Sequence, residues 1–116
     1  MLKREEILSK TSLKTETLTI EEWGGDIIIS EMSGTTRDIW EQALRKRDVA
    51  GNIISPRAKL VAFTVVDEKG ERIFKEDDVD SIGKLSSSSL EKICLVAMRL
   101  NGLGSDDIDK AKKNLN

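Results

Sequence analysis

Polar and hydrophobic residues alternate near the start of the chain. Residues 13–20 have the period-two pattern of a half-buried strand and are rich in β-branched threonine. The Gly24-Gly25 pair that follows is typical of a two-residue hairpin turn, and residues 27–31 then predict the returning strand. With this turn we expect Ile20 opposite Ile29. The face expected to meet the core carries Leu18, Ile20, Ile27 and Ile29.

Beyond residue 31, apolar side chains recur every three or four positions, as in amphipathic helices. This spacing predicts helices over residues 33–47, 55–65, 76–83, 89–101 and 105–116. Ser55 and Pro56 are residue types preferred at the N-cap and the first position of a helix, so we expect the second helix to begin there. Its buried stripe includes Val65, and Trp40 belongs to the apolar stripe of the helix before it.

These elements predict an α+β protein that is mostly α-helical, with an N-terminal β-hairpin. We expect residues 1–116 to form a single domain, because this length is near the mode for one domain. Its expected parts are a short, frayed N-terminal helix in residues 1–12, the hairpin in 13–31, a helical core in 32–104 and a C-terminal helix in 105–116.

Composition excludes several classes of function. Nineteen Lys and Arg stand against 21 Asp and Glu, a balance that argues against nucleic-acid binding, which needs a basic excess. With no histidine and a single cysteine, Cys94, the chain lacks the parts of Ser-His-Asp and Cys-His catalysis and of histidine-ligated metal sites. We therefore expect no enzyme activity, catalytic residue, metal or cofactor. The apolar runs are too short for a membrane span, the charged start is unlike a secretory signal, and a lone thiol fits a reducing cytoplasm.

Five apolar residues stand where a monomer normally has polar ones: Trp23, Ile28, Val49, Ile53 and Ile54. They are the candidates for binding a partner or a second copy, since exposed apolar patches mark interaction sites. The alternative is that a small domain simply leaves some apolar surface exposed. For the three residues of the loop at 48–54, the two interpretations stay open.

A series of short motifs then runs along almost the whole chain in a fixed order. The motifs are Glu22-Trp23-Gly24-Gly25, Met32-Ser33-Gly34, Arg37-Asp38, Trp40-Glu41, Arg57-Ala58-Lys59-Leu60-Val61-Ala62, Val66-Asp67-Glu68-Lys69-Gly70-Glu71-Arg72-Ile73-Phe74, Asp77-Asp78-Val79, Ile82-Gly83-Lys84, Leu90-Glu91-Lys92-Ile93 and Arg99-Leu100-Asn101-Gly102-Leu103. In this order and spacing the chain resembles the short form of the tail assembly chaperones of long-tailed bacteriophages.

The resemblance implies a non-enzymatic helper of virion assembly in the host cell cytoplasm that is absent from the mature virion. Such proteins bind the long tape measure protein, keep it soluble and bring tail tube subunits to it, with a frameshift-extended form as one route to the tube protein. We expect a client helix to lie in an apolar groove near residues 49–54, and copies of the chain to self-associate along the client. The competing hypotheses are a permanent tail structural or adaptor protein, an acidic binding module and, least favoured, an enzyme.

Overall fold

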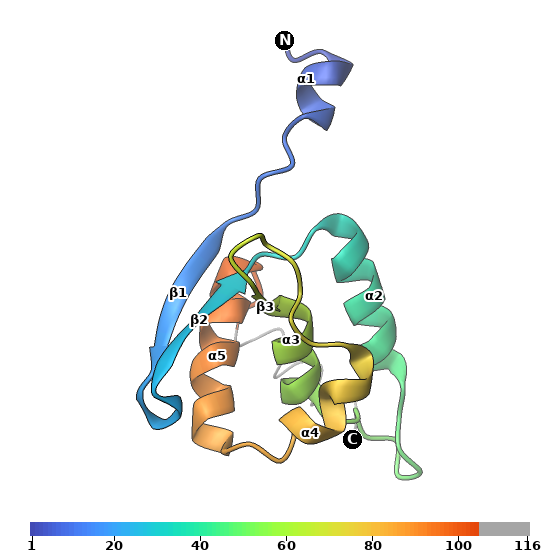
Figure 1. The fold of residues 1–116 in the computed structure, drawn as a ribbon. Coiled ribbons are helices and arrows are strands. Elements are labelled where there is room, and N and C mark those ends of the chain that lie inside the picture. Colours follow the sequence, from blue (N-terminus) through green and yellow to red (C-terminus); the bar gives the residue numbers. More distant parts are fainter. Residues whose placement is uncertain (105–116) are drawn as a thin grey trace.

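The computed structural model describes residues 1–104, so the helix expected at 105–116 lies outside the described residues. Within residues 1–104 the chain is α+β, with five α-helices and a three-stranded antiparallel sheet (Figure 1). The helices are α1 (Arg4–Leu8), α2 (Gly34–Arg45), α3 (Pro56–Thr64), α4 (Val79–Ile82) and α5 (Ser87–Leu100), with short 3-10 helices η1 (Glu21–Trp23) and η2 (Glu76–Asp78). The strands are β1 (Thr15–Ile20), β2 (Gly25–Ser30) and β3 (Val65–Val66), in the order β1-β2-β3.

The N-terminal hairpin is present, but its predicted register is wrong. Ile20 faces Gly25, and Glu16 faces Ile29. The connection is longer than a two-residue turn, because the η1 helix fills it and Gly24 alone closes it in the left-handed conformation, at φ 70°. The register therefore differs from the expected one by four residues. An even shift leaves every side chain on its expected face, so Ile20 and Ile29 are still fully buried.

The third strand was not predicted. Val65 was expected at the end of a helix, but α3 ends at Thr64, and Val65 and Val66 pair with Ile29 and Ile28 of β2. The Thr64 hydroxyl donates to the Leu60 carbonyl at 2.7 Å within the last turn of the helix. A strand of two residues is too short to show the alternation of a strand. No exposed polar residue separates it from α3, so the sequence does not mark where the helix ends.

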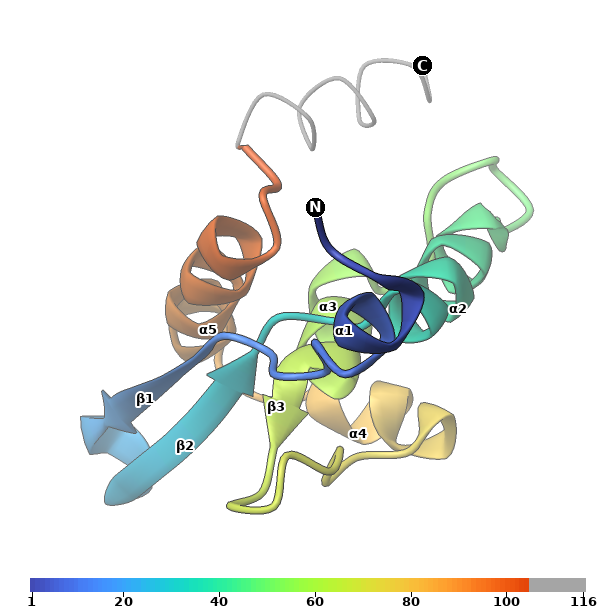
Figure 2. The same ribbon diagram turned by 90° about the horizontal axis from the view of Figure 1, so that it is seen from above.

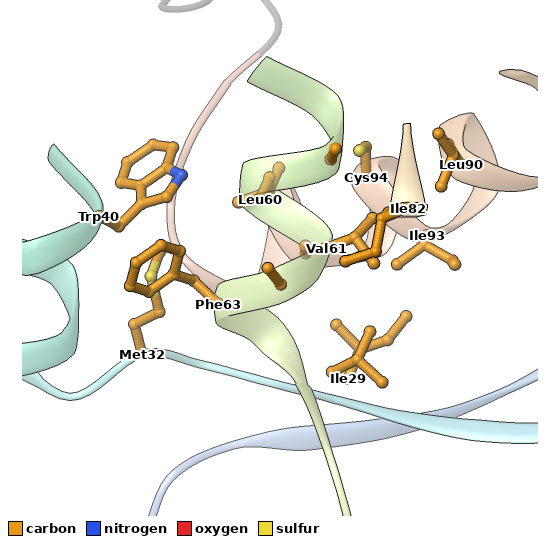
Figure 3. Close-up of a cluster of buried hydrophobic side chains, with 14 of the residues drawn as sticks. Ile29, Met32, Trp40, Leu60, Val61, Phe63, Ile82, Leu90, Ile93 and Cys94 are labelled. Atoms are coloured by element: carbon orange, nitrogen blue, oxygen red, sulfur yellow. The ribbon is translucent and has the colours of Figure 1, made fainter. Parts of the chain in front are cut away.

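Helix α3 lies at the centre of the core. It packs against α2 on one side and α5 on the other, and α5 also packs on β1 and β2 (Figure 2). Every residue from Ala58 to Thr64 is buried. Figure 3 shows Met32, Trp40 and Phe63 on the side of α3 that meets α2. On the other side lie Val61, Ile82, Leu90, Ile93 and Cys94.

The end of α5 is tied to the start of α2. The Leu103 N–H donates to the Met98 carbonyl at 2.8 Å and Gly102, at φ 66°, donates to Arg99 at 3.3 Å, which is a Schellman motif. The Asn101 side chain accepts a hydrogen bond from the Met32 N–H at 2.7 Å and donates to the Ala97 carbonyl at 2.8 Å. These bonds hold α5 against the segment that leads from β2 into α2.

Residues 1–14 form an arm that leaves the body of the protein at the start of β1 (Figure 1). All fourteen residues are exposed, those of α1 included. The base of the arm is held at Lys14, whose carbonyl accepts from the Glu31 N–H at 2.8 Å and whose N–H donates to the Glu31 carboxylate at 3.2 Å. The helix α1 lies within residues 1–12, where a short N-terminal helix is expected, and none of its residues contributes to the core.

Candidate functional site

The five candidate contact residues fall in three separate places. Trp23, 40% exposed, lies in the hairpin connection, and Ile28 lies half-buried on β2. Val49, Ile53 and Ile54 lie in the loop between α2 and α3. Both ribbon views place this loop and the hairpin connection on opposite sides of the molecule (Figures 1 and 2). The structure therefore does not bring the five together into one site.

The loop between α2 and α3 is an ordered turn built around one carboxylate. Asp48 Oδ1 accepts hydrogen bonds from the Ala50 and Asn52 N–H groups, each at 2.9 Å. The Asp48 N–H donates to the Asn52 carbonyl, and Gly51, at φ 86°, donates back to the Asp48 carbonyl, both at 3.0 Å. This frame uses backbone groups and the aspartate only, and it leaves the Val49 side chain fully exposed at the tip.

The loop after β3 has the same hydrogen bonds around an aspartate, but a different residue at its exposed tip. Asp67 Oδ1 accepts from the Lys69 N–H at 2.8 Å and the Glu71 N–H at 3.0 Å, and Gly70 at φ 84° donates to the Asp67 carbonyl. The position that corresponds to Val49 holds Glu68, which is exposed. A charged residue fits this tip, so the geometry of the turn does not require a valine. The valine at this tip is therefore a choice of the sequence and not a requirement of the turn.

The apolar residues of this loop lie among basic side chains. Ile54 is 38% exposed, and Ile53 is half-buried where it pairs with Arg47. The exposed basic residues nearest to them in the chain are Arg45, Lys46, Arg47 and Arg57. We call the apolar residues Val49, Ile53 and Ile54, with these four, the loop surface.

Lys59 of α3 holds the end of α2 beside the loop surface. Its side chain is buried, and its ammonium group donates to the Ala43 carbonyl in the last turns of α2 at 2.9 Å. Burial lowers the pKa of Lys59, and the positive charges of Lys46 and Arg47 lower it further. The side chain thus fixes the end of α2 next to the loop, and its own environment is already rich in positive charge.

The third place, around Ile28, is a shallow groove on the face of the sheet that points away from the helices. Ile28 pairs with Val66 of β3, so both side chains lie on that face, and Ile73 lines the groove beside them. The groove has a volume of about 560 Å³. Its other lining residues include Asp26, Asp67, Glu68, Lys69 and Glu71. We call it the sheet groove.

Sequence reasoning found one residue of the sheet groove and missed the others. Val66 was missed because β3 was not predicted. Ile73 and Phe74 are neighbouring apolar residues of an extended stretch, and Phe74 packs against the core while Ile73 is 50% exposed. The available signal was that an extended stretch can place only one of two neighbouring apolar residues inside.

Cys94, the one cysteine of the sequence, belongs to neither surface. The Cys94 thiol is buried, and its burial raises its pKa to about 11, which disfavours the reactive thiolate. Among residues 1–104 no group of three or more His, Cys, Asp or Glu side chains is placed to hold a metal ion. In the same part of the chain, no helix combines the length and the apolar character needed to cross a membrane.

Comparison with known proteins points to one family. A family model described as phage tail assembly chaperone matches residues 2–114. Among solved structures, the chain is similar to the tail assembly chaperone of bacteriophage HK97, with a TM-score of 0.57 over 83% of this chain and 91% of that one. The two sequences are 16% identical, so the likeness concerns the fold. No curated protein matches the sequence.

Proposed function

The chain belongs to the phage tail assembly chaperone family, and from this premise we propose that it binds the tape measure protein through the loop surface. In this role it keeps the tape measure protein soluble in the host cell cytoplasm and helps recruit tail tube subunits, with a frameshift-extended form as one route to them. It self-associates along its client and leaves before the virion is complete.

The exposed Val49 at the tip of an ordered turn is the observation that carries the proposal. A long helical client has apolar stripes that aggregate in water, and a helix-in-groove contact covers such a stripe. Val49 and Ile54 supply the apolar contact, and full burial of one such side chain is worth about 1.5–3 kcal/mol.

Charge gives this contact its specificity. The loop surface presents Arg45, Lys46 and Arg47 beside its apolar residues. Client segments with acidic residues beside their apolar stripe therefore fit it better than basic ones, since complementary charge selects partners and speeds association. Asp48 does not offset this preference fully, because its carboxylate is already engaged by two loop N–H groups.

Co-expression with the tape measure protein tests the proposal. We expect the wild-type chain to keep the client soluble and to co-purify with it, and the double variant V49D/I54D to lose both effects. Both residues are exposed and Val49 makes no contact in the core, so the variant is expected to fold. Unchanged co-purification of V49D/I54D would remove the loop surface from the proposal.

Two controls sharpen this test. W23D places an aspartate on a residue as exposed as Ile54, in the hairpin connection on the opposite side of the molecule, and is expected to behave like the wild type. If W23D lowers client binding as much as V49D/I54D does, the effect is not specific to the loop surface. Detection of the chain in purified virions would favour a permanent tail component over a chaperone that leaves.

A further inference from the structure

We propose that the arm formed by residues 1–14 of one copy docks in the sheet groove of a second copy. This inference deepens the self-association included in the proposed function and rests on it. It assigns both halves of the contact to named residues, none of which belongs to the loop surface.

The arm has the composition of a segment that needs a partner surface. Ile7 and Leu8 are 53% and 59% exposed, and no residue of α1 is buried. A helix of five residues has too few internal hydrogen bonds to be stable alone, since isolated helices shorter than about 12 residues are marginal in water. Contact with a surface that buries these two side chains would supply the missing stability.

Two basic residues stand at the start of α1, beside its apolar residues. Arg4, the first residue of α1, lies four positions before Leu8, so the two share one side of the helix, and Lys3 is the N-cap just before it. The Arg4 guanidinium lies 3.7 Å from the Glu5 carboxylate, and because both side chains are exposed this pair offsets little of its charge. A surface that receives Ile7 and Leu8 therefore also meets two positive charges.

The sheet groove has the complementary pattern. Ile28, Val66 and Ile73 give it an apolar floor, and Ile73 is exposed enough to contact an incoming side chain. Of its four carboxylates, those of Asp26 and Asp67 already accept hydrogen bonds from the Thr19 hydroxyl and from two loop N–H groups. The carboxylates of Glu68 and Glu71 are the ones that meet an incoming positive charge, beside the ammonium group of Lys69. Apolar floor and acidic lining match the two features of the arm.

The geometry favours a second copy over the arm of the same chain. The arm leaves from β1, which is the edge strand on the far side of β2 from β3, where the groove lies. The two hydrogen bonds between Lys14 and Glu31 direct it outward, and Figure 1 shows α1 beyond the end of the sheet. Arm and groove are different surfaces, so their contact is heterologous and repeats from copy to copy as an open chain.

Sedimentation of the full-length chain with two single-surface variants tests the proposal. The arm variant is I7D/L8D, and the groove variant is I73K, which changes an exposed residue. We expect the wild type to grow in mass with concentration and each variant alone to stay monomeric. An equimolar mixture of the two is expected to form heterodimers, because each pair still has one intact arm and one intact groove.

The mass of the wild type shows whether the groove takes the arm of a second copy or of its own chain. If the arm docks in the groove of its own chain, the wild type stays monomeric at every concentration, which overturns the proposal. If I7D/L8D associates as strongly as the wild type, the arm is not part of the contact. A charge exchange adds an independent check: K3E/R4E is expected to weaken association about tenfold or more, and E68K/E71K in the same chain to restore it. Failure of that rescue excludes the proposed pairing of charges.

These experiments distinguish failure of the arm contact from failure of the proposed client binding. If V49D/I54D loses the client but still self-associates, the arm contact stands without the loop surface. If the wild type is monomeric at every concentration while the client still co-purifies, the arm contact is wrong and client binding stands.

Discussion

Cys94 illustrates how burial decides the chemistry of a side chain. The thiol lies between α3 and α5 with its sulfur 3.7 Å from the Arg57 carbonyl oxygen. Burial raises its pKa to about 11 from an ordinary value of 9.0, and the nearby Glu91 carboxylate adds to the shift. The sequence suggested a buried thiol from its place in an apolar helical stretch, and this prediction is confirmed.

We predict that Cys94 reacts slowly with thiol reagents in the folded protein. A pKa of about 11 leaves about 100-fold less thiolate at pH 8 than a pKa of 9.0 does, and burial also blocks access. The measurement is the reaction rate with a chromogenic disulfide at pH 8, in buffer and in denaturant. Equal rates in the two conditions would contradict the predicted burial.

The same shift affects stability at alkaline pH. A raised pKa means that the folded state holds the proton more tightly than the unfolded chain does. Its contribution is therefore fully present below pH 9.0 and is lost as the pH rises through about 11. The control variant C94A lacks this loss, so the stability difference between wild type and C94A should shrink toward pH 11.

Asn101 is a polar residue on which the joint between α5 and α2 depends. Its side chain provides the acceptor for the Met32 N–H, and no apolar residue replaces that bond. We predict that N101A lowers the free energy of unfolding by about 1–3 kcal/mol, because the Met32 N–H then lacks its acceptor. Urea unfolding measures the change. N52A, in an exposed loop, is the control and should change stability by less than about 0.5 kcal/mol.

At the scale of elements, the end of α5 offers a test of backbone conformation. Gly102 has a φ of 66°, which an L-residue adopts at a cost of about 1–2 kcal/mol. No neighbouring atom lies within 4 Å of the position of an added Cβ, so strain of the backbone is the whole expected effect. We predict that G102A destabilises the protein by this amount in urea unfolding.

Gly34 provides the matched control. It opens α2 without a left-handed φ, and it too has open space around an added Cβ. G34A should therefore leave stability unchanged or raise it by about 0.4–1 kcal/mol, because alanine loses less entropy on folding. If G102A and G34A behave alike, the left-handed cap contributes nothing measurable.

The hairpin shows which part of an element sequence reasoning can predict. The face of each strand follows from alternation, and Ile20 and Ile29 are buried as expected. The register depends on the connection, where the Gly-Gly pair predicts a two-residue turn. Glu21–Trp23 instead form a 3-10 helix, a conformation with no distinctive residue pattern, so the pairing could not be derived from local sequence.

The two aspartate turns show the same limit for the candidate site. In both turns an Asp stands three residues before a Gly, and its carboxylate accepts the loop N–H groups. Sequence also identified Val49 as an unusual residue for its loop. The groove around Ile28 could not be predicted from local sequence. Val66 and Ile73 come close to Ile28 only because β3 pairs with β2, and strand pairing is a long-range property.

At the scale of the whole molecule, the contact surfaces lie apart. The loop surface follows α2, whereas the sheet groove lies against β2 and β3 on the outer face of the sheet. They also differ in charge, because the loop surface is basic and the groove acidic. In the proposed function, this separation leaves one copy free to hold a client and a neighbouring copy at once, the arrangement that suits a long client with many similar sites.

The last prediction follows from this arrangement. If neighbouring copies strengthen each other's hold on one client, self-association should matter for a long client and not for a short one. We predict that I7D/L8D binds a single-site client peptide with the affinity of the wild type. On the full-length tape measure protein, the same variant should bind about 100-fold more weakly, which is the lower end of typical avidity gains.

Titration calorimetry with the peptide and quantitative pull-down of the long client measure the two affinities. V49D/I54D is the matched control, because a variant that loses the client contact itself should fail with both ligands. Equal loss of peptide and long client by I7D/L8D would mean that the arm touches the client directly. Equal retention of both would mean that each copy binds alone, and the open chain of copies would then have no role in holding the client.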